Sequence, residues 1–439
     1  MWIDNKIHLN ILGGGPAGLA IGFYAQKKNI NFTLHEGTSK VGGNCKTYNS
    51  GSFRFDTGAH RFHDKYDDIT EDIFEIVNGD LKRINSPSKI FFNNEYYKFP
   101  IEIPDIILKM KMNLLKPIII ENILSKKITN VTNFEDYAIN KYGETLSKTF
   151  LINYTEKLWG CKPRDLAIDV AGDRLSNLSL FSSLIEMVSN KFTKKNHYDG
   201  IFYYPSKGYG SIFNCIYNII GSENVILNSI ITEITHNGKK FVAFKDKKNL
   251  YKVNHLISTL PINYFLDILK PSPPKEIIEI SNSIKFRSLK LLVIFLNIPC
   301  VSSNASIYFP EINIPFTRLY EPKNRSELMA PPNQTCIVLE IPYDPVNPLK
   351  LSNQQLYKDC SNILIDKNII NLKNIIGYKV FNLKNAYPVL EKSFYNKQKI
   401  LFDYIKSFSN IDLIGRSALF QYIHTHNIFK EAKTFINNI

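Results

Sequence analysis

Six cysteines occur in 439 residues, and no two of them form a C-x-x-C pair. A small disulfide-held scaffold needs many paired cysteines, so this dispersion excludes that class and favours reduced thiols. The pair His60 and His63 forms an H-x-x-H, but no cysteine or third histidine stands nearby at ligand spacing. We therefore expect no metal site.

Long apolar runs are also missing. The longest lie around residues 118–120 and 291–296, well short of the roughly 20 residues that cross a bilayer as a helix. The amino terminus enters a strand-like segment almost at once, which argues against a cleaved signal peptide. These absences predict a cytoplasmic protein.

Basic residues outnumber acidic ones, 54 to 40, and the formal net charge is +14. A positive protein can bind nucleic acid, a membrane surface or a phosphorylated small molecule. The lysines are spread through every segment, and no dense basic run is interleaved with aromatic residues, so we expect no nucleic-acid partner. The stretch 106–128 combines apolar residues with lysines. A membrane-surface helix is one interpretation of it, and packing against neighbouring helices is the favoured one.

The first 36 residues contain a pattern typical of dinucleotide binding. Residues 7–36 predict a strand, a glycine turn, a helix and a second strand, and Gly13, Gly15 and Gly18 occupy the G-x-G-x-x-G positions. The first glycine permits the tight turn, the second lets a pyrophosphate approach the backbone, and the third lets the helix lie close to the sheet. The pattern predicts a bound dinucleotide.

The start of this predicted helix and the end of the second strand complete the pattern. Pro16 and Ala17 begin the helix, whose free N–H groups and dipole attract an anion. Glu36 follows the second strand, where a carboxylate can accept hydrogen bonds from ribose hydroxyls.

Two further segments indicate backbone passing close to a flat ligand. The first is VGGN, with Gly42, Gly43 and Asn44, and the second is DTGAHRFH, with Gly58, Ala59, His60 and His63. Adjacent glycines are typical where no side chain fits. Cys45 follows the glycine pair and either attaches a flavin covalently or, as we favour, is a small buried side chain.

These segments, in this order and spacing, resemble the FAD-binding proteins of the amine oxidase and protoporphyrinogen oxidase superfamily, and in particular the UDP-galactopyranose mutases. Most oxidases of that superfamily have an arginine where this chain has Asn44, whereas the mutases have asparagine. The resemblance implies FAD as the cofactor. It adds Ile231, Gly415, Arg416 and Thr425 as cofactor contacts.

The resemblance also implies a substrate cleft. The segment YTEKLWG at 154–160 is similar to one that borders the cleft of the mutases, and FTRLYEPK at 316–323 to one beside their flavin. The implied cleft residues are Tyr154, Trp159, Tyr204, Arg318 and Tyr387. Arg318, His60 and His63 are the candidate catalytic residues. An Arg318–Glu321 ion pair and structural hydrogen bonds of the histidines are the alternatives.

Two leucines depart from the mutase pattern. Mutases have an arginine for the substrate diphosphate where this chain has Leu178, and a second one where it has Leu390. An aliphatic side chain offers no charged donor to a diphosphate. An ordinary UDP-sugar pose is therefore not expected.

The implied fold class is α/β. We expect a Rossmann-like FAD-binding domain with a parallel sheet and helices, formed by residues 1–90, 200–270 and 405–439. Residues 91–199 and 271–404 would form an inserted substrate domain of helices and antiparallel sheet. Nothing in the sequence indicates an oligomeric state.

The two departures favour an FAD-dependent oxidoreductase that accepts hydride from a small substrate. A sugar-linked substrate in bacterial surface-polysaccharide synthesis is what the resemblance implies. The alternative is a flavin-dependent sugar-ring isomerase like UDP-galactopyranose mutase. A flavin-binding protein without catalysis is a third interpretation.

Overall fold

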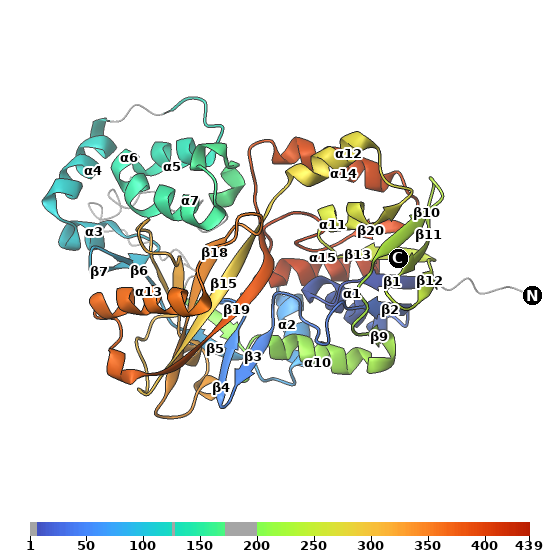
Figure 1. Cartoon of the computed structure of the whole chain (residues 1–439), viewed down its shortest axis with the longest axis horizontal. Helices are drawn as coiled ribbons and strands as arrows, with labels where there is room; N and C mark the ends of the chain where they lie inside the picture. The colour runs from blue at the N-terminus through green and yellow to red at the C-terminus, as the bar shows by residue number, and fades with distance from the viewer. Residues whose placement is uncertain (1–6, 125–127, 172–199) are drawn as a thin grey trace, which may run out of the picture.

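The computed structural model describes residues 7–124, 128–171 and 200–439, which form two lobes side by side (Figure 1). One lobe contains a parallel sheet covered by helices. The other contains a long, mostly antiparallel sheet with a group of helices at its far end. The predicted α/β class, with a Rossmann-like sheet and a mixed helical and antiparallel region, is confirmed.

The five-stranded sheet of the first lobe is parallel throughout and has the order β20-β13-β1-β2-β9. Its strands are β1 (His8–Leu12), β2 (Asn31–His35), β9 (Val225–Ile226), β13 (His255–Ser258) and β20 (Ile411–Leu413). The helices on it are α1 (Pro16–Lys27), α10 (Gly210–Ile220) and α15 (Thr425–Asn437). Segments far apart in the chain therefore assemble one sheet, in whose strand β1 every residue but His8 is buried.

A smaller sheet of order β12-β11-β10-β14 belongs to the same lobe. Its strands are β10 (Glu233–His236), β11 (Phe241–Lys245), β12 (Leu250–Lys252) and β14 (Leu269–Lys270). It shares an apolar cluster with α11 (Ile262–Asp267), α12 (Lys275–Ser283) and α14 (Phe394–Lys406). The predicted division placed α12 and α14 in the substrate domain. In the structure, Ile277 of α12 and Leu401 of α14 pack with Phe265 of α11, in the lobe of the five-stranded sheet.

The second lobe is built on a seven-stranded sheet of order β19-β15-β18-β17-β16-β6-β7, in which only the β16–β6 pairing is parallel. Its strands are β6 (Ser88–Phe92), β7 (Glu95–Phe99), β15 (Phe286–Leu296), β16 (Ser306–Tyr308), β17 (Arg318–Tyr320), β18 (Thr335–Tyr343) and β19 (Ile375–Pro388). Side chains of β15 alternate between two cores, Leu292 and Ile294 on one face and Leu291 and Val293 on the other. Helix α13 (Asn353–Asp366) covers the first face, and the hairpin of β3 (Thr47–Ser50) and β4 (Phe53–Asp56) covers the second.

Within the described ranges, a group of helices stands at the far end of this lobe, beyond β6 and β7 (Figure 1). They are α3 (Ile103–Lys109), α4 (Met112–Leu124), α5 (Phe134–Tyr142), α6 (Glu144–Ser147) and α7 (Asn153–Trp159). A π-helical turn, Lys148–Ile152, joins α6 to α7, and α7 ends at Gly160 in the left-handed conformation, a common helix stop.

Helix α2 (Asp67–Ile76) packs beside α10 and α15, and β5 (Lys82–Asn85) pairs with β8 (Ile201–Tyr204). Within the described ranges, no helix is both long and apolar enough to cross a membrane.

Candidate functional site

Two cavities meet where the lobes adjoin. The first, about 370 Å³, surrounds the glycine turn after β1, and we call it the glycine cavity. The second, about 690 Å³, lies between the seven-stranded sheet and the helices α5 and α7, and we call it the aromatic cleft. The residues that line both are Arg318, Tyr387, Tyr422, Ile423 and His424. The two spaces therefore adjoin and share one wall.

The glycine turn has the geometry that its sequence predicts. Gly13 has a φ of +106°, which favours glycine, and its N–H donates to the carbonyl of His35 at 2.8 Å. A Cβ on Gly18 would stand 1.9 Å from the carbonyl oxygen of Gly13, whereas a Cβ on Gly15 would meet only Gly43, at 3.7 Å. Gly18 thus permits close helix packing, and Gly15 leaves the space above it open.

The rest of the wall is made largely of backbone. A Cβ on Gly43 would lie 3.0 Å from the Cα of Gly15, so these two segments are in contact. Of the residues that we predicted for the cofactor, those lining the glycine cavity are Gly13, Gly15, Pro16, Ala17, Glu36, Gly43, Asn44, Gly58, Ala59, His60, Gly415, Arg416 and Thr425. Gly18 and Gly42 lie behind this wall.

Glu36 holds the loop at the cavity edge. Its Oε2 accepts the N–H of Gly14 at 2.9 Å, and its Oε1 accepts from the N–H and hydroxyl of Thr38 at 2.9 and 2.7 Å. Each carboxylate oxygen has two acceptor sites, so this bonding leaves capacity for a ribose hydroxyl.

Two predicted site residues lie elsewhere. Tyr204, predicted for the substrate cleft, is fully buried, and its hydroxyl donates to the carboxylate of Asp56 in the core. Its position in β8 directs it inward, as it does Phe202 two residues earlier. Ile231 is buried in another apolar cluster, and its carbonyl accepts the hydroxyl of Tyr264 at 2.6 Å. Neither residue lines either cavity, so we omit Tyr204 from the proposed cleft.

Arg318 stands on the shared wall, and its partner is not the expected one. Its guanidinium binds Glu340 through two bonds, Nε to Oε2 at 2.9 Å and Nη2 to Oε1 at 2.6 Å. Glu321 instead accepts from Thr335 and the backbone of residues 301 and 302. Burial acts to lower the pKa of Arg318, but the Glu340 carboxylate outweighs it and holds the pKa well above its usual range. The pair is a fixed, buried charge array.

Sequence reasoning missed Glu340, which also accepts the N–H of Ala59 at 3.2 Å and so touches the wall of the glycine cavity. The sequence nevertheless contained an indication that Glu340 has a partner. The segment 335–343, TCIVLEIPY, places one carboxylate in an otherwise apolar strand, and a charge in such a strand needs a partner.

Arg416 is the main unsatisfied donor of the site. Its Nε and Nη2 atoms are buried without a hydrogen-bond partner among the described residues. Its guanidinium lies 4.4 Å from the ring centre of Tyr422 and 5.1 Å from that of Tyr387. A guanidinium held between aromatic rings with free donors is suited to a ligand that brings anionic or carbonyl oxygens.

His60 and Cys45 lie in the opposite wall. Burial lowers the pKa of His60 to about 3, and Arg318 adds to this effect, so the ring is neutral at pH 7. It stacks on Tyr209 with ring centres 5.1 Å apart. Burial raises the pKa of the Cys45 thiol to about 12. Because the thiolate is the reactive form, this shift disfavours covalent attachment through Cys45.

Further histidines stand at the start of α15, close to the glycine cavity. His63 lines that cavity, 6.3 Å from His426 between ring centres, and His424 precedes Thr425, the first residue of α15. No group of three or more His, Cys, Asp or Glu side chains in the described ranges is placed to hold a metal ion.

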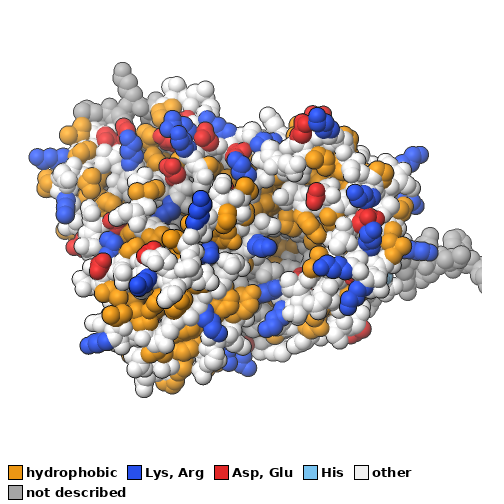
Figure 2. All heavy atoms as spheres, viewed as in Figure 1, with side chains coloured by type: hydrophobic (Ala, Val, Ile, Leu, Met, Phe, Trp, Pro, Cys, Tyr) orange, Lys and Arg blue, Asp and Glu red, His pale blue; other side chains and the backbone are white. Residues whose placement is uncertain are grey.

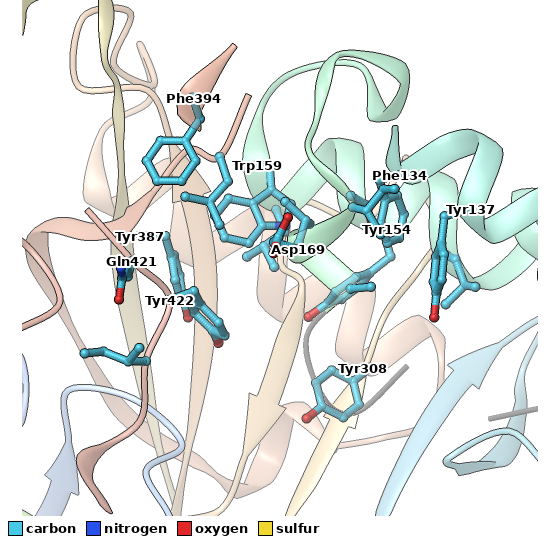
Figure 3. A pocket seen from close by; sticks show the side chains of 18 of the residues that line it. Phe134, Tyr137, Tyr154, Trp159, Asp169, Tyr308, Tyr387, Phe394, Gln421 and Tyr422 are labelled. Carbon is cyan, nitrogen blue, oxygen red and sulfur yellow. The ribbon is translucent and has the colours of Figure 1, made fainter. Parts of the chain in front are cut away.

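The aromatic cleft is lined by rings from several elements (Figure 3). Trp159 from α7, Tyr387 from β19 and Tyr422 lie together on one side, with each pair of ring centres 5.9 Å apart. Tyr154, Tyr308, Phe134 and Tyr137 lie on the other. Tyr308 was not predicted, because its strand carries no motif.

One of the two unexpected leucines lies in this cleft. Leu390 is buried and lines its wall, so an uncharged side chain stands there. Leu178, with the segment around Arg174, lies outside the described residues.

Comparison with known proteins agrees with this geometry. A model of the NAD(P)-binding Rossmann-like domain matches residues 11–77, and the model of the UDP-galactopyranose mutase family matches residues 149–362. A solved structure of reduced UDP-galactopyranose mutase has a TM-score of 0.85 and 19% identity, over 98% of this chain and 95% of that one. A cyclohexylamine oxidase from Brevibacterium oxydans has a TM-score of 0.67 and 10% identity, over 99% and 98%.

The fold and the glycine cavity define the class: the chain belongs to the FAD/NAD(P)-binding Rossmann superfamily, as predicted. Within it the chain is related to the UDP-galactopyranose mutases. A dTDP-fucopyranose mutase from Escherichia coli is 27% identical over 169 residues, which cover 36% of this chain and 44% of that relative. The match therefore spans less than half of the relative's length.

These findings correct the expected activity. We expected an oxidoreductase because two diphosphate arginines were missing. The family model covering residues 149–362 and the curated relative are both of mutases, so the expectation of an oxidoreductase is wrong.

Proposed function

We propose that this protein is an FAD-dependent mutase that interconverts the pyranose and furanose forms of a nucleotide sugar. One observation carries the proposal: a dinucleotide-type cavity and an aromatic cleft adjoin and share a wall that includes Arg318 and Tyr387. The similarity to UDP-galactopyranose mutase and dTDP-fucopyranose mutase supports this reaction class.

Two features of the glycine cavity fit FAD. The space above Gly15 is open to a pyrophosphate, and the unfilled donors of Arg416 require a polar ligand on the far side. FAD, when bound and reduced, supplies an electron-rich ring nitrogen that can attack the anomeric carbon of a sugar. Helix α15 starts at this cavity with Thr425, and its N-terminal dipole favours negative charge there.

The residues of the shared wall position the sugar. Arg318, held by Glu340 where the two cavities meet, keeps N–H donors beyond the two that bind the carboxylate, and donors fixed in place can stabilise a departing anion without reorganisation. Burial raises the pKa of the Tyr154 and Tyr387 hydroxyls above their usual range, so both stay protonated and can donate hydrogen bonds. His60 lines the glycine cavity, and because its lowered pKa makes the ring a weak base, it suits a hydrogen-bonding role better than that of a proton acceptor.

The aromatic cleft is the proposed site of the nucleotide sugar. Trp159 and the tyrosines offer ring faces for stacking and neutral hydroxyl donors. Because Leu390 replaces one charged donor, the phosphates would bind mainly to neutral donors and to Arg318.

The test is turnover by the purified protein. Its flavin is reduced with dithionite under anaerobic conditions, and dTDP-fucopyranose or UDP-galactopyranose is added. We expect a furanose product by NMR with the reduced protein and none with the oxidised protein. Bound flavin without furanose from either substrate would contradict the proposal.

A further inference from the structure

Helices α3 and α4 lie at the outer end of the second lobe (Figure 1) and expose a group of large apolar side chains. Leu108 is 82% exposed and Met112 59% exposed. The complete group is Ile107, Leu108, Met112, Ile119 and Ile120, which we call the α3–α4 apolar face. Five such residues within fourteen positions form a concentrated patch, and patches of this kind mark interaction sites.

The spacing along α4 places this face on one side of the helix. Met112, Ile119 and Ile120 stand at positions i, i+7 and i+8, which share a side. Leu115 and Ile118 are buried and pack into the core of the lobe. A surface helix normally has a polar outer side, whereas α4 is apolar on both sides and buries only one of them.

Lysines without carboxylate partners frame the face. Lys111 and Lys116 are exposed, and neither forms an ion pair within the described part of the chain. The carboxylates nearby are engaged elsewhere. Asp105 pairs with Lys109 at 2.6 Å, and Glu121 accepts from the N–H and hydroxyl of Thr145. In Figure 2 apolar and basic side chains stand side by side at this end of the molecule.

We propose that the α3–α4 apolar face docks on the surface of an anionic lipid bilayer. Apolar side chains of this kind enter the boundary between headgroups and acyl chains, while lysines reach the lipid phosphates. Each lysine near such a surface adds to the attraction. A second copy of the chain fits less well, because a two-fold interface would bring Lys111 and Lys116 of both copies together.

The experiment is co-sedimentation of the full-length protein with vesicles. One set contains phosphatidylcholine with about one third phosphatidylglycerol, and the other contains phosphatidylcholine alone. We expect binding to the anionic set, weakened by salt. We expect about tenfold or greater loss of binding in Leu108→Ser/Met112→Ser/Ile120→Ser, and a similar loss in Lys111→Glu/Lys116→Glu.

The matched control is Leu250→Ser/Lys252→Glu on β12, where Leu250 is 72% exposed but stands alone. This control should bind vesicles like the wild type, and all variants should keep the wild-type unfolding midpoint. Equal binding to both vesicle sets, no binding, or an equal loss in the control would overturn the proposal. A dimer that the triple variant dissociates, without vesicle binding, would identify a second copy as the occupant.

Discussion

The two cavities of the site are built in different ways. The glycine cavity is built around glycines, and an added Cβ at Gly13, Gly18 or Gly415 would stand 2.5 Å or less from a neighbouring atom. The aromatic cleft is formed by side chains from α5, α7, β16, β17, β18 and β19, and it includes the Arg318–Glu340 pair. The first therefore depends on the absence of side chains, and the second on which side chains meet.

The two cavities are therefore sensitive to different kinds of substitution. Adding atoms should close the glycine cavity without disturbing the cleft. Removing a charge or a ring should disable the cleft while the glycine cavity keeps its ligand. The variants below test this separation.

The largest effect is expected for Gly15→Val. The new side chain points into open space in the glycine cavity, so the fold should persist while the flavin content falls below about a tenth of the wild-type value. Flavin absorbance per protein and circular dichroism measure the two effects. Gly200→Val is the control, since its Cβ would also make only one ordinary contact, at 3.6 Å, away from the site. Full flavin content in Gly15→Val would show that the glycine cavity has another use.

The second-largest effect is expected for Glu340→Gln. It leaves the buried guanidinium of Arg318 without a charged partner, which should lower the free energy of unfolding by about 3 kcal/mol. Turnover should also fall. In the control Glu102→Gln the lost pair with Lys98 is exposed, so the change should stay within about 1 kcal/mol. Urea unfolding measures the change in the free energy of unfolding in both variants. Equal changes would mean that the Arg318–Glu340 pair contributes no more stability than the exposed pair.

Trp159→Leu should raise KM about tenfold, because a lost ring contact in a buried site costs on the order of 1 kcal/mol. Flavin content should not change, since Trp159 lines only the aromatic cleft. Trp159→Phe keeps a ring and should show a smaller rise in KM. Steady-state kinetics with the reduced protein provide the measurement. A loss of flavin in Trp159→Leu would mean that the cavities are not separable.

The smallest effect is expected for the pH dependence of the free energy of unfolding, through His60. The pKa of His60 is lowered from 6.5 to about 3 in the folded protein, so between these values the unfolded chain binds a proton that the folded chain does not. The stability that His60 contributes is therefore complete above about pH 6.5 and is lost as the pH falls toward 3. Between pH 7 and pH 6, His60→Gln should flatten this dependence by about 0.7 kcal/mol. His236→Gln, at a ring that lines neither cavity, is the control for urea unfolding at each pH.

Much of the glycine cavity could be predicted because its determinants are consecutive in the chain. The glycine at position 18 acts on Gly13, five residues away, so the spacing of the motif already indicates the turn. Gly415 and Arg416 could be placed there only through the resemblance, because nothing local links residue 416 to residue 15.

The partner of Arg318 could not be predicted from residues close to it in the sequence. We considered Glu321, three residues on, but residues 318–320 form a strand, in which positions three apart face opposite sides. The antiparallel register of β17 and β18 sets Arg318 directly opposite Glu340. That register depends on packing of the whole sheet.

The amino-acid sequence thus determined the Rossmann-like class, the glycine turn and many of the residues that line the glycine cavity, because the motif positions act locally. Strand pairing and lobe packing decided the rest: that Tyr204 lies in the core, that Glu340 holds Arg318, and that Tyr308 and Tyr422 line the cleft. Side-chain neighbourhoods are long-range properties, and a one-residue change in register would exchange the faces of a strand.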